Sequence, residues 1–139
     1  MIERPSVDFD WELPPEPIEI VAGPVQLRPW EERLVGELAA LRGCEELDAV
    51  DRRLREWREG VALSFAVQEI TTARLLGEVV LHPLPDRVAA LSWWGLPEAA
   101  GEVAETALGA LTRWALGALG AQQVRHHTDP EPGHPLAAQ

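Results

Sequence analysis

Two side chains that can exchange protons, Glu78 and His82, lie four residues apart in a segment that alternates like a β-strand. Residues at even spacing on a strand share a face, so both should lie on one face with Leu76 and Val80. A carboxylate and an imidazole that face one groove are suited to act as a catalytic acid–base pair on a bound substrate. The plainer alternative is that both side chains lie near the end of the strand and are solvated.

Other residues of metal-binding or nucleophilic type form weaker patterns. His126 and His127 are adjacent, and His134 follows in a proline-rich stretch. Neighbouring residues on a strand point to opposite faces, and no second ligand pair occurs at a regular spacing, so we predict no metal site. Cys44, the single cysteine, has no histidine near it in the sequence, which favours a small apolar residue over a nucleophile.

A strand that leads directly into a helix is the arrangement best suited to hold an anion. Residues 89–96 are apolar apart from Ser92, which is typical of a strand buried on both faces, and Pro97 ends it. The helix that follows has apolar residues mostly three or four apart on one face: Ala104, Leu108, Leu111, Ala115 and Leu119. The first N–H groups of a helix are unpaired and lie at the positive end of its dipole, so this junction predicts an anion site.

Five short matches to a known pattern run through the same segment: Leu96-Pro97-Glu98, Val103-Ala104, Ala107-Leu108, Arg113-Trp114-Ala115 and Leu119-Gly120. With them the chain resembles the GNAT superfamily of acyl-CoA N-acyltransferases, in its RimJ/RimL-like branch. The resemblance covers roughly residues 20–129. It implies transfer of an acetyl group from acetyl-CoA to a primary amine.

The resemblance also implies which residues bind acetyl-CoA. The backbone of the strand end would hold the pantetheine and thioester, and the loop with the first helical turn would surround the pyrophosphate. The first set is Trp94, Gly95 and Leu96, and the second is Gly101, Val103, Ala104 and Glu105. The loop departs from the family pattern, because Ala100 replaces Arg or Gln, the second glycine is absent and the loop is one residue short. The chain also lacks tyrosine, which protonates the leaving thiolate in many relatives.

Three glutamates near the start of this helix leave the function open. Glu98, Glu102 and Glu105 face the helix dipole, where each stabilises the helix by about 0.3–1 kcal/mol. They then occupy the positive end that a polyanionic cofactor needs. The function predicted by resemblance is an N-acetyltransferase with weak activity, and the alternative is a catalytically inactive homologue that serves as a binding or assembly module. A truncated gene product with no distinct role is a third interpretation.

The composition limits the partners. The 139 residues carry a net charge of −11, with 12 arginines and no lysine, which disfavours nucleic acid and anionic membranes. A hydrophobic fraction of 46% is typical of one folded domain. The sequence opens on no basic, apolar signal segment and has no apolar run of about 18 residues, so we predict a soluble, cytoplasmic protein.

We divide the chain into an extended segment rich in proline and acids (1–24), a GNAT-like domain (25–128) and a proline-rich tail (129–139). Within the domain, the patterns predict helices near residues 31–42, 45–59 and 103–119, and strands near 25–28, 63–67, 74–82, 89–96 and 122–128. Residues 18–21 are a candidate for a further edge strand.

The fold class predicted by resemblance is α/β (α+β), with a mixed, mostly antiparallel sheet and helices on both faces. In the family, a further helix and two strands follow, for which residues 129–139 are too short. The strand at residues 122–128 would then have an unpaired edge, a liability that proteins cover or pair. We therefore predict a homodimer or a hetero-complex that shields this edge.

Overall fold

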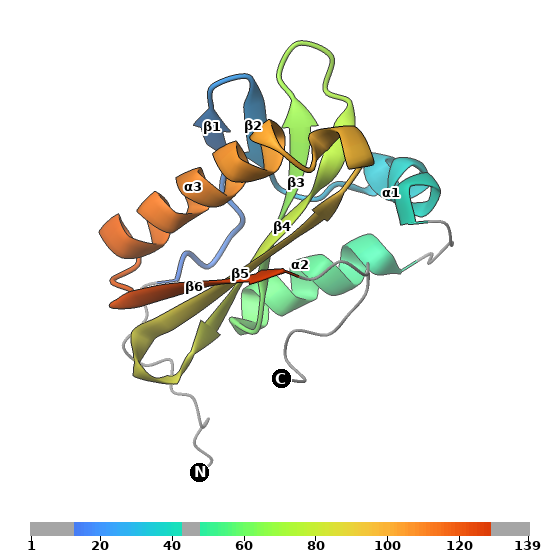
Figure 1. Cartoon of the computed structure of the whole chain (residues 1–139). Coiled ribbons are helices and arrows are strands. Elements are labelled where there is room, and N and C mark those ends of the chain that lie inside the picture. The colour runs from blue at the N-terminus through green and yellow to red at the C-terminus, as the bar shows by residue number, and fades with distance from the viewer. Residues whose placement is uncertain (1–12, 43–47, 129–139) are drawn as a thin grey trace.

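The computed structural model describes residues 13–42 and 48–128 of the chain. In this part, six strands form one curled sheet, ordered in space as they are in sequence (Figure 1). The strands are β1 (Ile20–Ala22), β2 (Val25–Arg28), β3 (Leu63–Glu69), β4 (Leu75–Leu84), β5 (Val88–Gly95) and β6 (Gln123–Thr128). Neighbouring strands pair antiparallel except β5 and β6, which are parallel.

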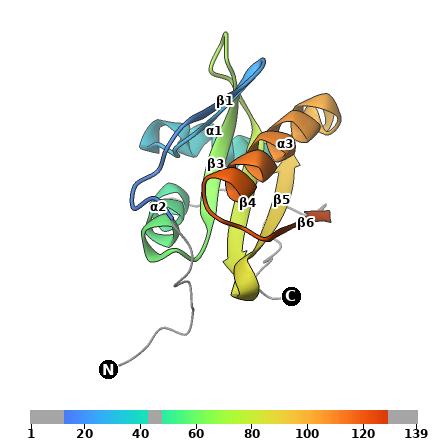
Figure 2. The ribbon, with the colours of Figure 1, turned by 90° about the vertical axis from the view of Figure 1, so that its left-hand side faces the viewer.

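Helices cover both faces of the sheet. Helix α3 (Glu102–Gly117) lies on one face, and α1 (Val35–Arg42) and α2 (Ala49–Glu59) lie on the other (Figure 2). Short 3-10 turns precede α1 (Glu32–Leu34), β5 (Pro85–Arg87) and α3 (Pro97–Ala99). This architecture confirms the predicted fold class. No helix of the described residues is both long and apolar enough to cross a membrane.

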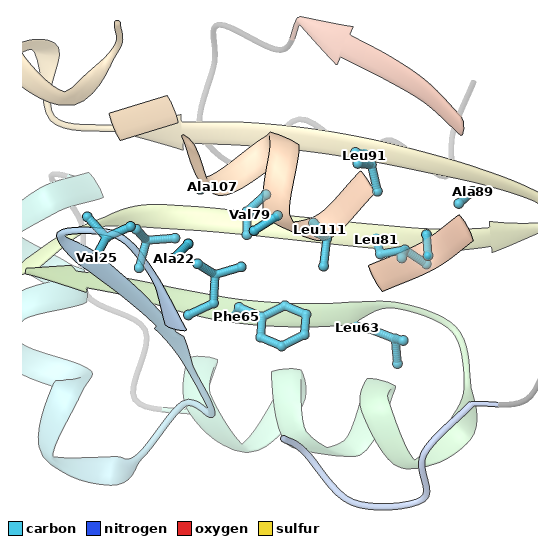
Figure 3. Close-up of a cluster of buried hydrophobic side chains, with 14 of the residues drawn as sticks. Ala22, Val25, Leu63, Phe65, Val79, Leu81, Ala89, Leu91, Ala107 and Leu111 are labelled. Atoms are coloured by element: carbon cyan, nitrogen blue, oxygen red, sulfur yellow. The ribbon is translucent and has the colours of Figure 1, made fainter. Parts of the chain in front are cut away.

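The larger hydrophobic core lies between α3 and the sheet (Figure 3). Ala107 and Leu111 of α3 are fully buried there, which matches the apolar face predicted from the helical spacing. Phe65 of β3 is enclosed edge-to-face by Trp57, with ring centroids 5.1 Å apart, and by Trp114, at 5.6 Å. Each aromatic pair of this kind contributes about 0.5–1.5 kcal/mol beyond the area it buries. The aromatic residues therefore tie α2 and α3 to the same strand.

A β-bulge in β4 divides its side chains between two cores. One step along β3 from Val67 corresponds to two steps along β4, from Gly77 to Leu75, so the residue between them is extra. That residue, Leu76, packs in the larger core under α3, whereas Leu75 packs in a smaller core under α1 and α2. The predicted alternation, which placed Leu76 on the face of Glu78, is wrong at this position because of the bulge.

Local signals set several element boundaries. Helix α2 ends where Gly60 adopts a left-handed conformation with φ of 72°, as its position predicted. The candidate edge strand forms as β1, so the sheet begins at Ile20, inside the segment expected to lead into the domain.

Some predicted features lie outside the described residues. Helix α2 begins at Ala49 in the described part, and its predicted start at residue 45 falls in the gap at 43–47. Cys44, His134 and the tail at 129–139 also lie outside it.

Candidate active site

The candidate site lies where β5 ends and leads into the turn before α3. Strand β5 pairs with β4 along its whole length, and it pairs with β6 from Val88 to Trp93, which lies opposite Thr128, the last residue that the structure describes. The Leu96 N–H donates to Leu76 O at 2.9 Å. Successive residues of a strand direct their N–H groups to opposite edges, so the Gly95 N–H points away from β4, toward the side of β6. A backbone donor in this place is suited to polarise an acyl carbonyl.

Two facing glycines and one indole shape this strand end. Gly95 pairs with Gly77 of β4. A Cβ atom on Gly95 would lie 2.6 Å from Trp93 Cζ2, and a Cβ atom on Gly77 would lie 2.5 Å from Trp93 Cη2. The Trp93 indole therefore lies over both Cα atoms and leaves no room for a side chain at either position. Gly77 is absent from the predicted site residues, although a glycine inside a strand pattern signals a close approach.

The first turn of α3 presents three backbone N–H groups ahead of its hydrogen-bond ladder. The first bond of that ladder runs from the Glu105 N–H to Gly101 O at 3.0 Å. The N–H groups of Glu102, Val103 and Ala104 precede it and have no partner within the helix. The structure thus brings the predicted pyrophosphate residues together at one helix N-terminus, where the backbone and the dipole favour an anion.

Carboxylates oppose an anion at this helix start. Glu102 and Glu105 lie exposed in the first turn of α3, whereas Glu98 lies in the 3-10 turn before it. Glu98 forms an exposed ion pair with Arg74 Nη2 at 3.0 Å. A hydrogen bond from its own backbone N–H, and then the Arg74 guanidinium, hold the pKa of Glu98 below its ordinary value. Arg74 therefore offsets one of the three negative charges, and Glu102 and Glu105 carry the other two.

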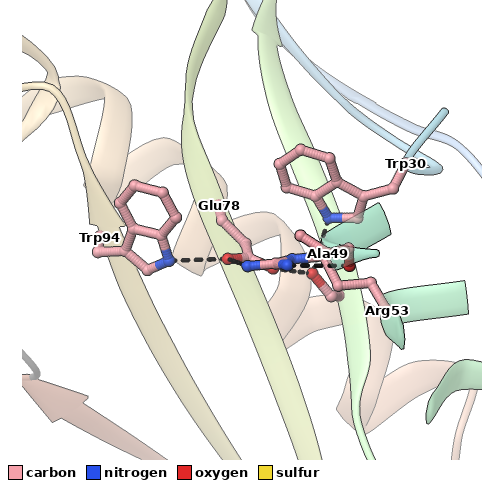
Figure 4. A network of polar contacts seen from close by, with 6 residues as sticks. Trp30, Ala49, Arg53, Glu78 and Trp94 are labelled. Carbon is pink, nitrogen blue, oxygen red and sulfur yellow. Dashed lines mark hydrogen bonds and ion pairs between the residues drawn. The ribbon is translucent and has the colours of Figure 1, made fainter. Parts of the chain in front are cut away.

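Glu78 is buried in a polar network that joins α2, β3 and β5 (Figure 4). Its Oε2 atom accepts hydrogen bonds from Arg53 Nε at 2.6 Å and from the Ser64 hydroxyl. Its Oε1 atom accepts from Arg53 Nη2 at 3.1 Å and from Trp94 Nε1 at 2.7 Å. The side chains of Arg53 and Glu78 are only 7% and 4% exposed, so the interpretation that Glu78 is solvated is wrong.

This network keeps Glu78 ionised. Burial alone raises the pKa of Glu78, but the charge of Arg53 and the hydrogen bonds from Arg53, Ser64 and Trp94 outweigh it and hold the pKa below its ordinary value. A carboxylate offers about four acceptor positions, and here four donors face them. The geometry therefore favours a structural role for Glu78 over that of a general base.

Strand β4 does not bring His82 close to Glu78. The two residues follow the bulge at even spacing and share a face, but His82 pairs with Ala90 and Glu78 pairs with Trp94. At about 3.3 Å per residue, the two lie about 13 Å apart along the strand. They are too distant to share one substrate proton. In the described residues, no group of three or more His, Cys, Asp or Glu side chains is placed to hold a metal ion.

We expect the Glu78 network to make the protein sensitive to acid. The pKa of Glu78 in the folded protein lies below its value of about 4.3 in the unfolded chain. The ionised carboxylate therefore contributes its full stability above that pH, and this contribution is lost as the pH falls through the folded pKa. In urea unfolding between about pH 6 and pH 3, the wild type should lose more stability than the variant Arg53→Met/Glu78→Gln, which retains every other carboxylate. Parallel losses in the two proteins would contradict this expectation.

Comparison with known proteins identifies the fold. No protein-family model matches the sequence, and a search of curated proteins finds no match. A Vibrio cholerae protein described as a "putative ribosomal-protein-serine acetyltransferase" is similar, with a TM-score of 0.72 over 83% of this chain and 76% of that chain, at 21% identity. RimJ of Mycobacterium smegmatis, solved in complex with CoA-disulfide, gives a TM-score of 0.70 over 87% of this chain and 72% of that chain, at 17% identity.

A third solved structure supplies the family name. An acetyltransferase of the GNAT family from Bacillus anthracis gives a TM-score of 0.56 over 73% of this chain and 68% of that chain, at 16% identity. The chain, with this strand order and its parallel β5–β6 pair, is thus similar to solved structures of acetyltransferases. The chain has the fold of the GNAT acetyltransferases.

Proposed function

We propose that the protein is an acetyl-CoA-dependent N-acetyltransferase with a primary amine as acceptor. The proposal rests on two groups of backbone N–H donors that follow each other along the chain. The first is the Gly95 N–H at the end of β5, and the second is the three N–H groups at the start of α3. The first set suits an acyl carbonyl and the second suits a pyrophosphate. The CoA-disulfide in M. smegmatis RimJ supports the same class of ligand.

The site residues fit acetyl-CoA through their backbone and oppose it through their charge. The backbone of Trp94, Gly95 and Leu96 would hold the pantetheine and thioester, and the first turn of α3 would hold the pyrophosphate. Acetyl-CoA supplies an activated acetyl thioester, which a free amine can attack. The exposed carboxylates of Glu102 and Glu105 lie at the same helix start, so each weakens the binding of a polyanion.

The protein would contribute position and electrostatics more than proton transfer. The Gly95 N–H would stabilise negative charge on the carbonyl oxygen of the tetrahedral intermediate. Glu78 is occupied by its own donors, and the sequence has no tyrosine to protonate the leaving thiolate. General acid catalysis typically raises the reaction rate about 10²–10⁴-fold, although a thiolate can also leave without a proton donor. We therefore propose slow turnover.

Calorimetric titration with acetyl-CoA, together with an assay of thiol release on peptides with a free amine, tests the proposal. We expect a dissociation constant of about 1 mM or weaker, which is about 4 kcal/mol of binding free energy. Glu102→Gln/Glu105→Gln should tighten binding about 3- to 30-fold at low salt, because two charges near the pyrophosphate are removed.

A charge-matched control separates local from overall charge. Asp51→Asn/Glu59→Gln removes two charges from exposed positions of α2 and should leave the affinity unchanged. If neither the wild type nor Glu102→Gln/Glu105→Gln binds acetyl-CoA or releases thiol, the proposal is rejected.

The alternative function is a catalytically inactive protein of this fold that serves as a binding or assembly module. Glu102 and Glu105 favour it, because two carboxylates in the first turn of α3 oppose the binding of an anion there. In the described residues β6 pairs only with β5, so we also propose that a homodimer or a hetero-complex covers the outer edge of residues 122–128. A monomer in light scattering at high micromolar concentration, with fast amide exchange in β6, would count against this assembly.

A further inference from the structure

We infer that the buried Arg53–Glu78 pair positions the end of β5 through the indole N–H of Trp94. The inference rests on the proposed function, which places the acyl carbonyl at that strand end. It gives Glu78 a positioning role in the reaction instead of the acid–base role that its residue type suggests.

Helix α2 and strand β3 hold the Glu78 carboxylate in place. Arg53 contacts both carboxylate oxygens, at 2.6 and 3.1 Å, and Ser64 donates to one of them. Arg53 is itself restrained, because its Nη1 donates to Ala49 O at 3.1 Å and its guanidinium carbon lies 5.1 Å from the centroid of the Trp30 ring. A carboxylate restrained from these directions presents its remaining acceptor position in a fixed orientation.

Trp94 takes that remaining position and connects the network to the candidate site. Glu78 and Trp94 are cross-strand neighbours, and the indole N–H reaches Oε1 at 2.7 Å. The Leu96 N–H donates to Leu76 O, so the main-chain ladder holds this strand end from the β4 side. The indole bond adds a side-chain restraint at the residue next to Gly95. We therefore expect the orientation of the Gly95 N–H to depend on it.

Two tryptophans form a matched pair for the test. Trp94 donates to Glu78, and Trp57 Nε1 donates to Pro14 O at 2.9 Å, outside the Glu78 network. Replacing either residue with phenylalanine keeps an aromatic ring and deletes one N–H. If the loss of an indole hydrogen bond acts only through overall stability, the two changes should have similar effects, whereas the positioning role predicts an effect on the strand end from Trp94 alone.

Amide exchange and steady-state kinetics on the full chain distinguish the two roles. In Trp94→Phe, the Leu96 amide, which donates to Leu76 O, should exchange about 10-fold faster than in the wild type. The kcat for acetyl transfer should fall about 10-fold or more, because a displaced donor no longer meets the carbonyl, and KM for acetyl-CoA should change less. Trp57→Phe should leave both quantities within about twofold of the wild type, even if it lowers the melting temperature as much as Trp94→Phe does.

Two results would overturn the inference. One is equal exchange at Leu96 in the two variants, and the other is a kcat of Trp94→Phe within about twofold of the wild type. If neither the wild type nor Glu102→Gln/Glu105→Gln binds acetyl-CoA or releases CoA, the proposed function is rejected, and the exchange comparison alone then decides whether the Arg53–Glu78 pair positions the strand end.

Discussion

Replacing Arg53 or Glu78 alone should destabilise the protein by about 3–5 kcal/mol, because either change leaves the partner's charge buried without its counterion. Both side chains are almost fully buried, so water cannot solvate the remaining charge. The variants Arg53→Met and Glu78→Gln keep approximate side-chain volumes and remove the charge, together with the hydrogen bonds of Arg53 in the first and one acceptor oxygen in the second. Urea unfolding at neutral pH measures the effect, which is a large part of the roughly 5–15 kcal/mol that stabilises a domain of this kind.

The double variant Arg53→Met/Glu78→Gln provides the decisive comparison. It leaves no buried charge and keeps an amide oxygen that can accept from Trp94, so it should recover most of the stability that either single change loses. The exposed pair of Arg74 and Glu98 serves as a control, and Arg74→Met should leave the urea midpoint unchanged. Additive losses in the double variant would show that the two charges do not depend on each other.

Replacing Gly95 with alanine should destabilise the protein by about 1–3 kcal/mol or more. The new Cβ atom would lie 2.5 Å from Leu76 O and 2.6 Å from the Trp93 ring. The first of these atoms is backbone, so no side-chain rotation relieves the overlap, and β4 and β5 must separate. The same movement would shift the Gly95 N–H, so turnover should fall more steeply than stability alone explains.

A second glycine supplies the control for this change. Gly109 lies within α3, and a Cβ atom there would be 3.6 Å from its nearest neighbour, Arg113 Nη1, which is an ordinary contact. Gly109→Ala should therefore leave the protein unchanged or stabilise it by up to about 1 kcal/mol, through helix propensity. If Gly95→Ala and Gly109→Ala unfold at the same urea concentration, the close approach at the strand end has no energetic importance.

The elements around the candidate site follow from local sequence, and the exceptions have physical causes. Pro97 and the apolar spacing after it predict β5 and α3, because proline cannot continue a strand and one helical face must be buried. The bulge at Leu76 could not be predicted, since its neighbours are apolar on both sides and only the pairing with β3 shows which residue is extra. Because of the bulge, the alternation of side chains between the two faces cannot be extended from Glu78 back to Leu76.

The burial of Glu78 required a partner distant in sequence, although one signal was available. Arg53 lies in a charged stretch, but it stands three residues after Val50 and four before Trp57, in the apolar stripe of α2. A cation in that stripe must find an anion inside the protein, and Glu78 is the buried carboxylate that meets it. The helix start was indicated by the junction of an apolar strand with a helix. The backbone donor at Gly95 leaves no such trace, because any residue type supplies an N–H group, so the family resemblance had to indicate it.

The Arg53–Glu78 pair also constrains how this sequence can diverge. If either single replacement lowers the free energy of unfolding by several kcal/mol, an evolving lineage that acquires it would lose much of its folded protein. This holds even where the doubly replaced protein would be stable. The two positions should therefore change together or with prior stabilising substitutions elsewhere. Homologues of this chain should carry both charges or neither, and that covariation would connect a residue of α2 with a residue of β4 across 25 positions of sequence.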